Sequence, residues 1–122
     1  MKHSFFNRQN AAVALLYSPQ SISEAVGLAR AGEMDGADAI AVELQKLPLD
    51  QRTEENFRAV INSVQLPFMF IDYRSDLFLK ADDEARQEYL LLAAKCGAEV
   101  IDVMGDLYDP APFELTRNPA AV

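Results

Sequence analysis

The sequence predicts an α/β fold built on a parallel β-sheet, and two observations support this prediction. Short apolar runs typical of buried strands recur roughly every 30 residues, which is the size of a strand–helix–strand unit. Between each pair of runs lies a segment with helical apolar periodicity and its own start and stop signals. With 122 residues, the chain is long enough for one domain with a sizeable core.

The first unit begins with the apolar run from Ala11 to Tyr17, which a Ser-Pro pair ends. The length and polar borders of this run suit a strand that is buried on both faces. Ser21 and Glu24 then form a capping-box pattern that opens a helix. This helix is predicted to end between Gly32 and Gly36, with Gly32 a plausible stop, and its apolar face comprises Ile22, Ala25, Val26 and Ala29.

The second and third units repeat this order. The run from Ala39 to Leu44 is the second predicted strand, and Pro48 breaks the chain after it. Thr53 can cap a helix whose inner face comprises Phe57, Val60, Ile61 and Val64. Pro67 opens the third apolar run, from Phe68 to Ile71, and proline is tolerated at the first residue of a strand.

A third helix and a fourth strand complete the pattern. Asp82 or Asp83 can cap the helix, which stops at Gly97 and carries inward Tyr89, Leu92, Ala93 and Cys96. The fourth strand is predicted from Glu99 to Met104, and residues 108–122 form a proline-containing loop.

Four such units equal half of an eightfold (β/α)8 barrel, so we expect residues 1–122 to form a single half-barrel-like domain. A half-barrel leaves two strand edges unpaired, which is a liability. Either the chain is a fragment or truncated form of a longer barrel, or two copies pair as a homodimer. A small open doubly wound sheet is the alternative. Its five-stranded receiver-like form fails because the segment after the first strand, residues 17–20, has no acidic cluster.

The composition excludes several classes of partner. Nineteen acidic and eleven basic side chains give a net charge of −8, with no cluster of Lys or Arg. Nucleic acids and anionic membranes are therefore not expected partners. No apolar run reaches the length of a transmembrane helix, and the N-terminus lacks the pattern of a signal peptide. The single cysteine, Cys96, excludes a disulfide framework and suits a cytoplasmic protein, and we expect it to be a small packing residue.

Polar side chains stand at the ends of three predicted strands. Glu43 ends an otherwise apolar strand and Gln45 follows it, Arg74 follows the third strand, and Asp102 lies within the fourth. A buried carboxylate is costly unless it is paired or hydrogen-bonded. Because the carboxyl ends of parallel strands are where α/β folds bind ligands, these residues are the candidate site.

The order of these motifs resembles type I 3-dehydroquinate dehydratase, a (β/α)8 lyase of the shikimate pathway. The matching features are a Gly-Ala-Asp segment at residues 36–38 before Glu43, a proline-led third strand that ends in Arg74, and Gly97-Ala98 before Asp102. The resemblance covers residues 11–104, as the N-terminal half of the family's barrel. It implies an enzyme that removes water from 3-dehydroquinate through a Schiff base between a lysine and the substrate ketone.

The resemblance also implies roles for single residues. Glu43 matches the family's glutamate that binds substrate hydroxyls, and Arg74 matches its strand-three arginine in the same site. Gln45 and Asp102 complete the substrate-binding set, whose ligand would be a small polyhydroxy acid. Charge-assisted hydrogen bonds suit such recognition. No cofactor and no metal are implied.

The chain also departs from the family. Gln45 stands where the family usually has Arg, and Met104 stands where a Glu is common. The loop at residues 75–79 lacks the family's Glu-Gly-Gly. The catalytic histidine and lysine of the family belong to later strands, so this chain would supply only substrate-binding residues. Whether it is an enzyme, a carbon–oxygen lyase, therefore stays open.

Other polar residues have ordinary explanations beside functional ones. Glu43 and Arg74 could form a structural ion pair, and Asp72 could point either way. Because successive side chains of a strand point to opposite faces, we expect Lys46 to point away from Gln45. Three further residues, which we expect to be a solvent-exposed side chain and two turn formers, are His3, Asp106 and Asp109. The second functional hypothesis is a non-catalytic half-barrel that binds a small molecule or self-assembles as a homodimer.

Overall fold

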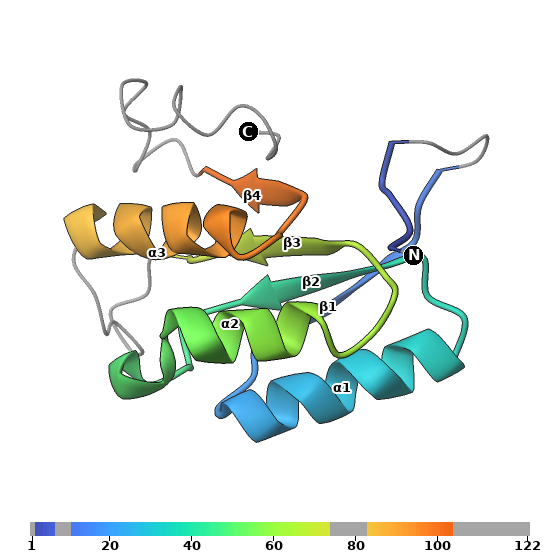
Figure 1. The fold of residues 1–122 in the computed structure, drawn as a ribbon, viewed down its shortest axis with the longest axis horizontal. Helices are drawn as coiled ribbons and strands as arrows, with labels where there is room; N and C mark the ends of the chain where they lie inside the picture. Colours follow the sequence, from blue (N-terminus) through green and yellow to red (C-terminus); the bar gives the residue numbers. More distant parts are fainter. Residues whose placement is uncertain (1, 7–10, 74–82, 104–122) are drawn as a thin grey trace.

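A computed structural model of the chain describes residues 2–6, 11–73 and 83–103. Four parallel strands form one sheet in the order β1-β2-β3-β4: β1 (Ala14–Tyr17), β2 (Ala39–Glu43), β3 (Phe68–Ile71) and β4 (Val100–Asp102) (Figure 1). Helices α1 (Ile22–Met34), α2 (Glu54–Ile61) and α3 (Asp83–Lys95) alternate with the strands, and a short 3-10 helix, η1 (Leu49–Gln51), precedes α2. The predicted order of four strands and three helices is therefore confirmed.

Local signals in the sequence explain where the helices begin. The Ser21 hydroxyl accepts a hydrogen bond from the backbone N–H of Glu24 (3.0 Å), as the capping-box pattern predicts. The Thr53 hydroxyl caps α2 in the same way by accepting from the N–H of Asn56 (3.2 Å). The helix α1 runs past the predicted stop at Gly32, which lies buried within it.

Gly32 is instead a point of close packing. A Cβ atom at this position would lie 3.0 Å from the Tyr17 hydroxyl and 3.0 Å from Cδ1 of Ile40. The absence of a side chain therefore lets α1 approach β1 and β2. Two other glycines have positive φ angles, Gly36 (89°) and Gly97 (114°), and they form the turns after α1 and α3, where left-handed backbone favours glycine.

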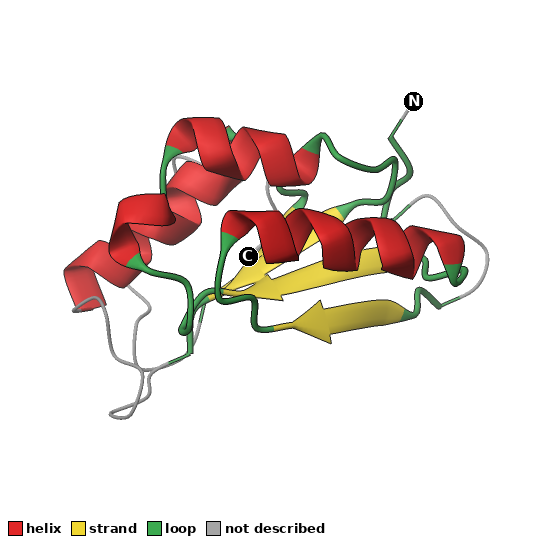
Figure 2. Ribbon diagram, turned by 90° about the horizontal axis from the view of Figure 1, so that it is seen from below, coloured by secondary structure: helices red, strands yellow, loops and turns green. Residues whose placement is uncertain are grey.

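All three helices lie on one face of the sheet, as Figure 2 shows. Alternate residues of each strand point into the core between sheet and helices, and they comprise Leu15, Tyr17, Ile40, Val42, Phe68, Phe70 and Ile101. The predicted inner face of α2 is confirmed, since Phe57, Val60 and Ile61 are buried there. The rings of Phe57 and Phe70 lie 5.1 Å apart, centroid to centroid, in a tilted arrangement.

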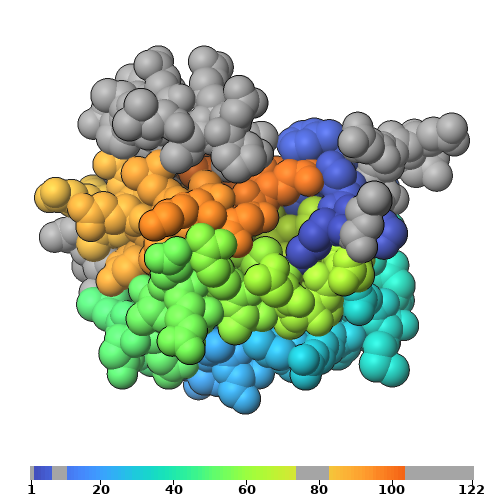
Figure 3. Space-filling view, in the orientation of Figure 1, coloured from blue at the N-terminus to red at the C-terminus, as the bar shows by residue number. Residues whose placement is uncertain are grey.

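The N-terminal segment, residues 2–6, packs at the amino-terminal end of the sheet, against the chain between α2 and β3 and beside β4 (Figure 3). The Lys2 ammonium group donates hydrogen bonds to the carbonyl oxygens of Ile61, Val64 (2.8 Å) and Leu66 (2.9 Å). The Glu99 carboxylate accepts from the backbone N–H of Phe5 (2.6 Å) and from the hydroxyl of Ser4 (2.9 Å). This end of the sheet is therefore closed by main-chain and side-chain hydrogen bonds.

Within the described segments, none of the helices has the length and apolar character needed to cross a membrane.

Candidate functional site

The buried carboxylate of Glu43 is the centre of the carboxyl-terminal end of the sheet. Glu43 is the last residue of β2 and is only 1% exposed. It stands in register with Ile71 of β3, which stands in register with Asp102 of β4. By alternation these three side chains share the face away from the helices. At the usual strand spacing, Glu43 and Asp102 stand about 10 Å apart.

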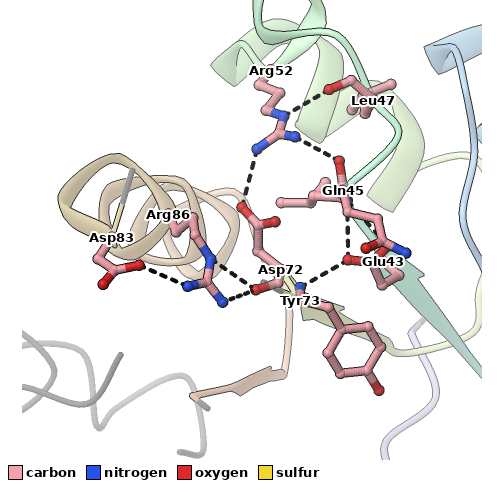
Figure 4. Close-up of polar contacts among 9 residues, drawn as sticks. Glu43, Gln45, Leu47, Arg52, Asp72, Tyr73, Asp83 and Arg86 are labelled. Carbon is pink, nitrogen blue, oxygen red and sulfur yellow. Dashed lines mark hydrogen bonds and ion pairs between the residues drawn. The ribbon is translucent and has the colours of Figure 1, made fainter. Parts of the chain in front are cut away.

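The Glu43 carboxylate connects the segments that follow three strands, and Figure 4 shows its contacts with Gln45 and Tyr73. One oxygen, Oε1, accepts hydrogen bonds from the backbone N–H groups of Tyr73 (2.9 Å) and Gln45 (3.0 Å). The other oxygen, Oε2, accepts from the hydroxyl of Ser18 (3.2 Å) and shares the Gln45 N–H (3.1 Å). The segments after β1, β2 and β3 are thereby held to one side chain.

Glu43 has no ion-pair partner within residues 2–6, 11–73 and 83–103. Burial raises the pKa of this carboxyl above its ordinary value. The hydrogen bonds from Tyr73, Gln45 and Ser18 oppose that rise because they favour the charged form. The nearby negative charge of Asp72 adds to the rise in the pKa.

Asp72 is the second buried carboxylate at this end, and two buried arginines hold it (Figure 4). Nη1 of Arg52 forms an ion pair with Oδ2 of Asp72 at 3.0 Å, while the same guanidinium donates to the carbonyl oxygens of Leu47 (3.0 Å) and Leu44 (2.6 Å). Nε and Nη2 of Arg86 both donate to the backbone carbonyl of Asp72, at 3.1 and 2.5 Å. Residue 72 is thus fixed through both its side chain and its main chain.

Burial raises the pKa of Asp72, and the positive charges of Arg52 and Arg86 oppose this rise. Arg86 also forms an ion pair with Asp83 (2.9 Å), one turn earlier on α3. The Arg52 guanidinium lies over the ring of Tyr89, 5.0 Å from its centroid. Helix α3, the segment before α2 and the end of β3 are therefore joined by one charged network.

The four predicted substrate-binding residues have different surroundings. Glu43 is buried and fully hydrogen-bonded, as described above. The side chains of Gln45 and Asp102 are partly exposed and form no hydrogen bond or ion pair within the described part of the chain. Arg74 lies outside the described residues. A ligand role for these four residues stays a prediction.

Sequence reasoning overlooked Arg52 and Arg86, which are among the most deeply buried polar side chains of the described residues. A signal for Arg86 was present, because it lies in helical phase with the buried residues Leu90, Ala93 and Ala94. An arginine on the inward face of a helix needs a buried partner. Tyr73 was not predicted as a site residue either. Its side chain points away from the arginine network in Figure 4 and has no polar partner within the described ranges, so it is available to a ligand.

The remaining singled-out residues lie elsewhere. His3 is exposed at the opposite end of the sheet, where its backbone N–H donates to the carbonyl of Gln65 (2.8 Å). Cys96 is buried beside α2, with its sulfur 3.6 Å from the carbonyl oxygen of Glu54, as a packing residue would be. Asp106 and Asp109 lie outside the described residues. No three His, Cys, Asp or Glu side chains of the described ranges converge as metal ligands.

Comparison with known proteins identifies the fold. No family model matches the chain, and no curated protein matches it by sequence. Among solved structures, the chain is similar to dihydrodipicolinate synthase from Agrobacterium tumefaciens, with a TM-score of 0.63 and 22% sequence identity. The match covers 94% of this chain and 39% of that chain. The chain therefore has the fold of half an α/β barrel, as the sequence predicted.

The resemblance to type I 3-dehydroquinate dehydratase is wrong, because the structural match is to a different barrel protein. The motifs behind it were short polar segments at the ends of parallel strands, and many barrels place polar residues there. In this chain the Glu43 carboxylate accepts hydrogen bonds from the loops that follow β1, β2 and β3. These bonds explain a glutamate at the end of the strand without a dehydroquinate site. A shikimate-pathway role has no support from the comparisons.

Proposed function

We propose that the carboxyl-terminal end of the sheet binds a small hydroxylated molecule, and that the chain supplies the binding half of a barrel enzyme. The observation that carries this proposal is the buried carboxylate of Glu43. It fixes the segments after three strands, while the side chains of Gln45, Tyr73 and Asp102 remain without a described polar partner. A rigid support that presents unpaired polar groups is what a binding site requires.

The chemistry of the three side chains suits hydroxyl groups. The Asp102 carboxylate accepts hydrogen bonds, and such charge-assisted bonds are stronger than neutral ones. The Gln45 amide both donates and accepts, and the Tyr73 hydroxyl does the same. A small polyhydroxy acid is our preferred ligand, because the predicted site residue Arg74 follows Tyr73 directly and would pair with a carboxylate.

The position in the fold supports an enzymatic origin. Active sites of eightfold barrels lie at the carboxyl-terminal end of the strands, where these residues stand. The similar solved protein is a synthase, and this chain spans 39% of its length. We assign no bond-making step to the described lysines: Lys2 lies at the opposite end of the sheet, Lys95 lies at the exposed end of α3, and Lys46, which follows Gln45, is predicted to point away from it.

A nuclear magnetic resonance titration tests this proposal with two probes, gluconate and the uncharged polyol sorbitol. We expect both probes to shift the amide signals of Gln45, Tyr73 and Asp102, and gluconate to bind more tightly. Asp102→Asn should weaken binding of both probes roughly tenfold, because a charge-assisted hydrogen bond is lost. The matched control is Asp35→Asn, an exposed change after α1 at the other end of the sheet, which should leave both affinities unchanged.

Two results would contradict the proposal. One is the absence of signal shifts at the three residues with either probe. The other is equal weakening by Asp102→Asn and Asp35→Asn, which would indicate a general charge effect rather than a contact at β4.

A further inference from the structure

Two peptide groups at the carboxyl-terminal end of the sheet are each held from both sides. The N–H groups of Gln45 and Tyr73 donate to the carboxylate of Glu43, at 3.0 and 2.9 Å. The carbonyl oxygens of the same two peptide groups belong to Leu44 and Asp72, and each accepts from a buried guanidinium. One carboxylate is therefore connected to two buried arginines through two peptide groups.

The connection from Arg86 passes through the peptide group between Asp72 and Tyr73 (Figure 4). Nε and Nη2 of Arg86 both donate to the Asp72 carbonyl oxygen, at 3.1 and 2.5 Å, while Nη1 pairs with Asp83 at 2.9 Å. The side chain of Arg86 is only 1% exposed, so helix α3 holds the guanidinium in one place. The carbonyl side of this peptide group is thus anchored to α3, and its N–H side to β2 through Glu43.

The connection from Arg52 is built differently. Nη2 of Arg52 donates to the carbonyl oxygen of Leu44 at 2.6 Å, and the same oxygen accepts from the N–H of Leu47 at 2.9 Å. The carbonyl side of the Gln45 peptide group is therefore held by two separate residues, and neither of them is Arg86. This peptide group serves as an internal reference for the one that precedes Tyr73.

Holding both polar ends of a peptide group determines where the next side chain begins. The group is planar and rigid, so fixing its carbonyl oxygen and its N–H fixes the plane, which contains the Cα atom of Tyr73. Hydrogen bonds in such a chain also polarise one another, so donation by Arg86 to the carbonyl strengthens the bond from the Tyr73 N–H to Glu43. Loss of the guanidinium would free the plane to turn.

We propose that Arg86 is a positioning residue for the candidate site, and that it orients Tyr73 through the peptide group that it shares with Glu43. Arg86 is buried and acts through this peptide group, so it needs no contact with a ligand. The inference rests on the proposed function only in treating Tyr73 as a ligand-binding residue. A chain that binds neither gluconate nor sorbitol would contradict the proposed function and not the role of Arg86, which is tested without ligand.

Amide hydrogen exchange of the full chain, measured residue by residue without ligand, tests the proposal. In Arg86→Met, the amide of Tyr73 should exchange at least about tenfold faster, whereas the amide of Gln45 should change less than about threefold. The ratio of the two rates is decisive, because a general loss of stability raises both. Arg86→Lys should restore part of the difference, since lysine keeps a charged donor. The matched control is Arg58→Met, which removes an exposed arginine of α2 and should leave the ratio unchanged.

A second measurement uses the unmodified chain, so that it does not depend on the folding of a variant. Nuclear magnetic resonance should detect scalar couplings across the hydrogen bonds, between the guanidinium nitrogens of Arg86 and the carbonyl carbon of Asp72. The absence of these couplings would overturn the proposal. Equal acceleration of the Gln45 and Tyr73 amides in Arg86→Met would overturn it too, as would unchanged exchange at Tyr73.

Discussion

Two buried carboxylates at the same end of the sheet are stabilised in different ways. Glu43 is 1% exposed and Asp72 is 3% exposed, and burial raises the pKa of both. Asp72 has a guanidinium partner at 3.0 Å, whereas the donors to Glu43 among the described residues are all neutral. The negative charge is therefore essential to the network around Asp72, while around Glu43 the essential property is the ability to accept hydrogen bonds.

This difference assigns different roles to the two residues. The ion pair between Arg52 and Asp72 joins the segment before α2 to the end of β3 and is shielded from water. The contacts of Glu43 instead join the backbone of the segments that present Gln45 and Tyr73. We expect the Asp72 network to govern the stability of the fold and the Glu43 contacts to govern the geometry of the candidate site.

Neutralising Asp72 should have the largest effect. Asp72→Asn keeps the shape of the side chain but leaves the buried guanidinium of Arg52 without its counter-charge. Breaking a buried pair in this way costs about 3–5 kcal/mol, so the free energy of unfolding in urea should fall by about that amount. The control is Glu54→Gln, which neutralises the exposed partner of Arg58 on α2 and should change stability far less. Similar losses for both variants would contradict the network described here.

Removing all acceptors at position 43 should have the next largest effect. Glu43→Leu fills the space but leaves the N–H groups of Gln45 and Tyr73 and the Ser18 hydroxyl without their acceptor. Each buried donor left unpaired costs about 1–3 kcal/mol. Because some of the three donors can turn toward water, we expect the free energy of unfolding in urea to fall by about 2–3 kcal/mol in total. Amide hydrogen exchange should also become faster at Gln45 and Tyr73. A stable variant with unchanged exchange there would show that Glu43 does not hold these segments.

The fold could be predicted in detail because its signals are local. Ser21 and Thr53 cap helices by contacts three residues away, and the third strand was predicted at Phe68–Ile71, as observed. The strand β1 is shorter than the apolar run from Ala11, because a run of apolar letters does not show where pairing with a neighbour begins. The end of α1 at Met34 lies within the predicted range of residues 32–36, but Gly32 itself is not the stop, because it serves close packing against β1 and β2, a tertiary requirement.

The site could be predicted only in part. Its location at the strand ends follows from parallel topology, and Glu43 was identified because a charge at the end of an apolar strand needs a reason. Its partners could not be predicted, since they include backbone N–H groups, which no sequence pattern marks. Asp72 and Arg52 are 20 residues apart, so their pairing depends on how β3 packs against the segment before α2.

Removing a single donor to Glu43 should have a smaller effect than removing the carboxylate. Ser18→Ala deletes the hydroxyl that donates to Oε2, while the two backbone N–H groups still bind the carboxylate. Because the loss of one such hydrogen bond costs about 1 kcal/mol, the free energy of unfolding measured in urea should fall by about that amount. Ser23→Ala, an exposed change in the first turn of α1, is the matched control. If both variants unfold alike, the bond from Ser18 contributes nothing measurable.

The smallest effect at neutral pH should come from Glu43→Gln, and this variant separates the two buried carboxylates most clearly. Glutamine keeps one oxygen for the N–H groups of Gln45 and Tyr73, and its amide N–H can donate to the Ser18 hydroxyl, which accepts as well as donates. No buried cation loses its partner. We therefore expect the free energy of unfolding at pH 7 to change by less than about 1 kcal/mol, in contrast to Asp72→Asn.

The pH dependence of this variant gives the sign of the Glu43 contribution. Because burial raises the pKa of Glu43 in the folded state, the folded protein binds more protons than the unfolded chain between the ordinary pKa of 4.5 and the raised value. The stability from this group is complete below the ordinary pKa and is lost as the pH rises through the raised pKa. Asp72 keeps its burial and its arginine partners in the variant, so these contributions cancel. Its coupling to the Glu43 charge acts in the same direction as the rise in the Glu43 pKa. The difference in unfolding free energy, natural chain minus Glu43→Gln, should therefore fall as the pH rises through this window. A constant difference would mean that the pKa of Glu43 is the same in the folded and unfolded states, and a rising difference would mean that its hydrogen bonds outweigh burial.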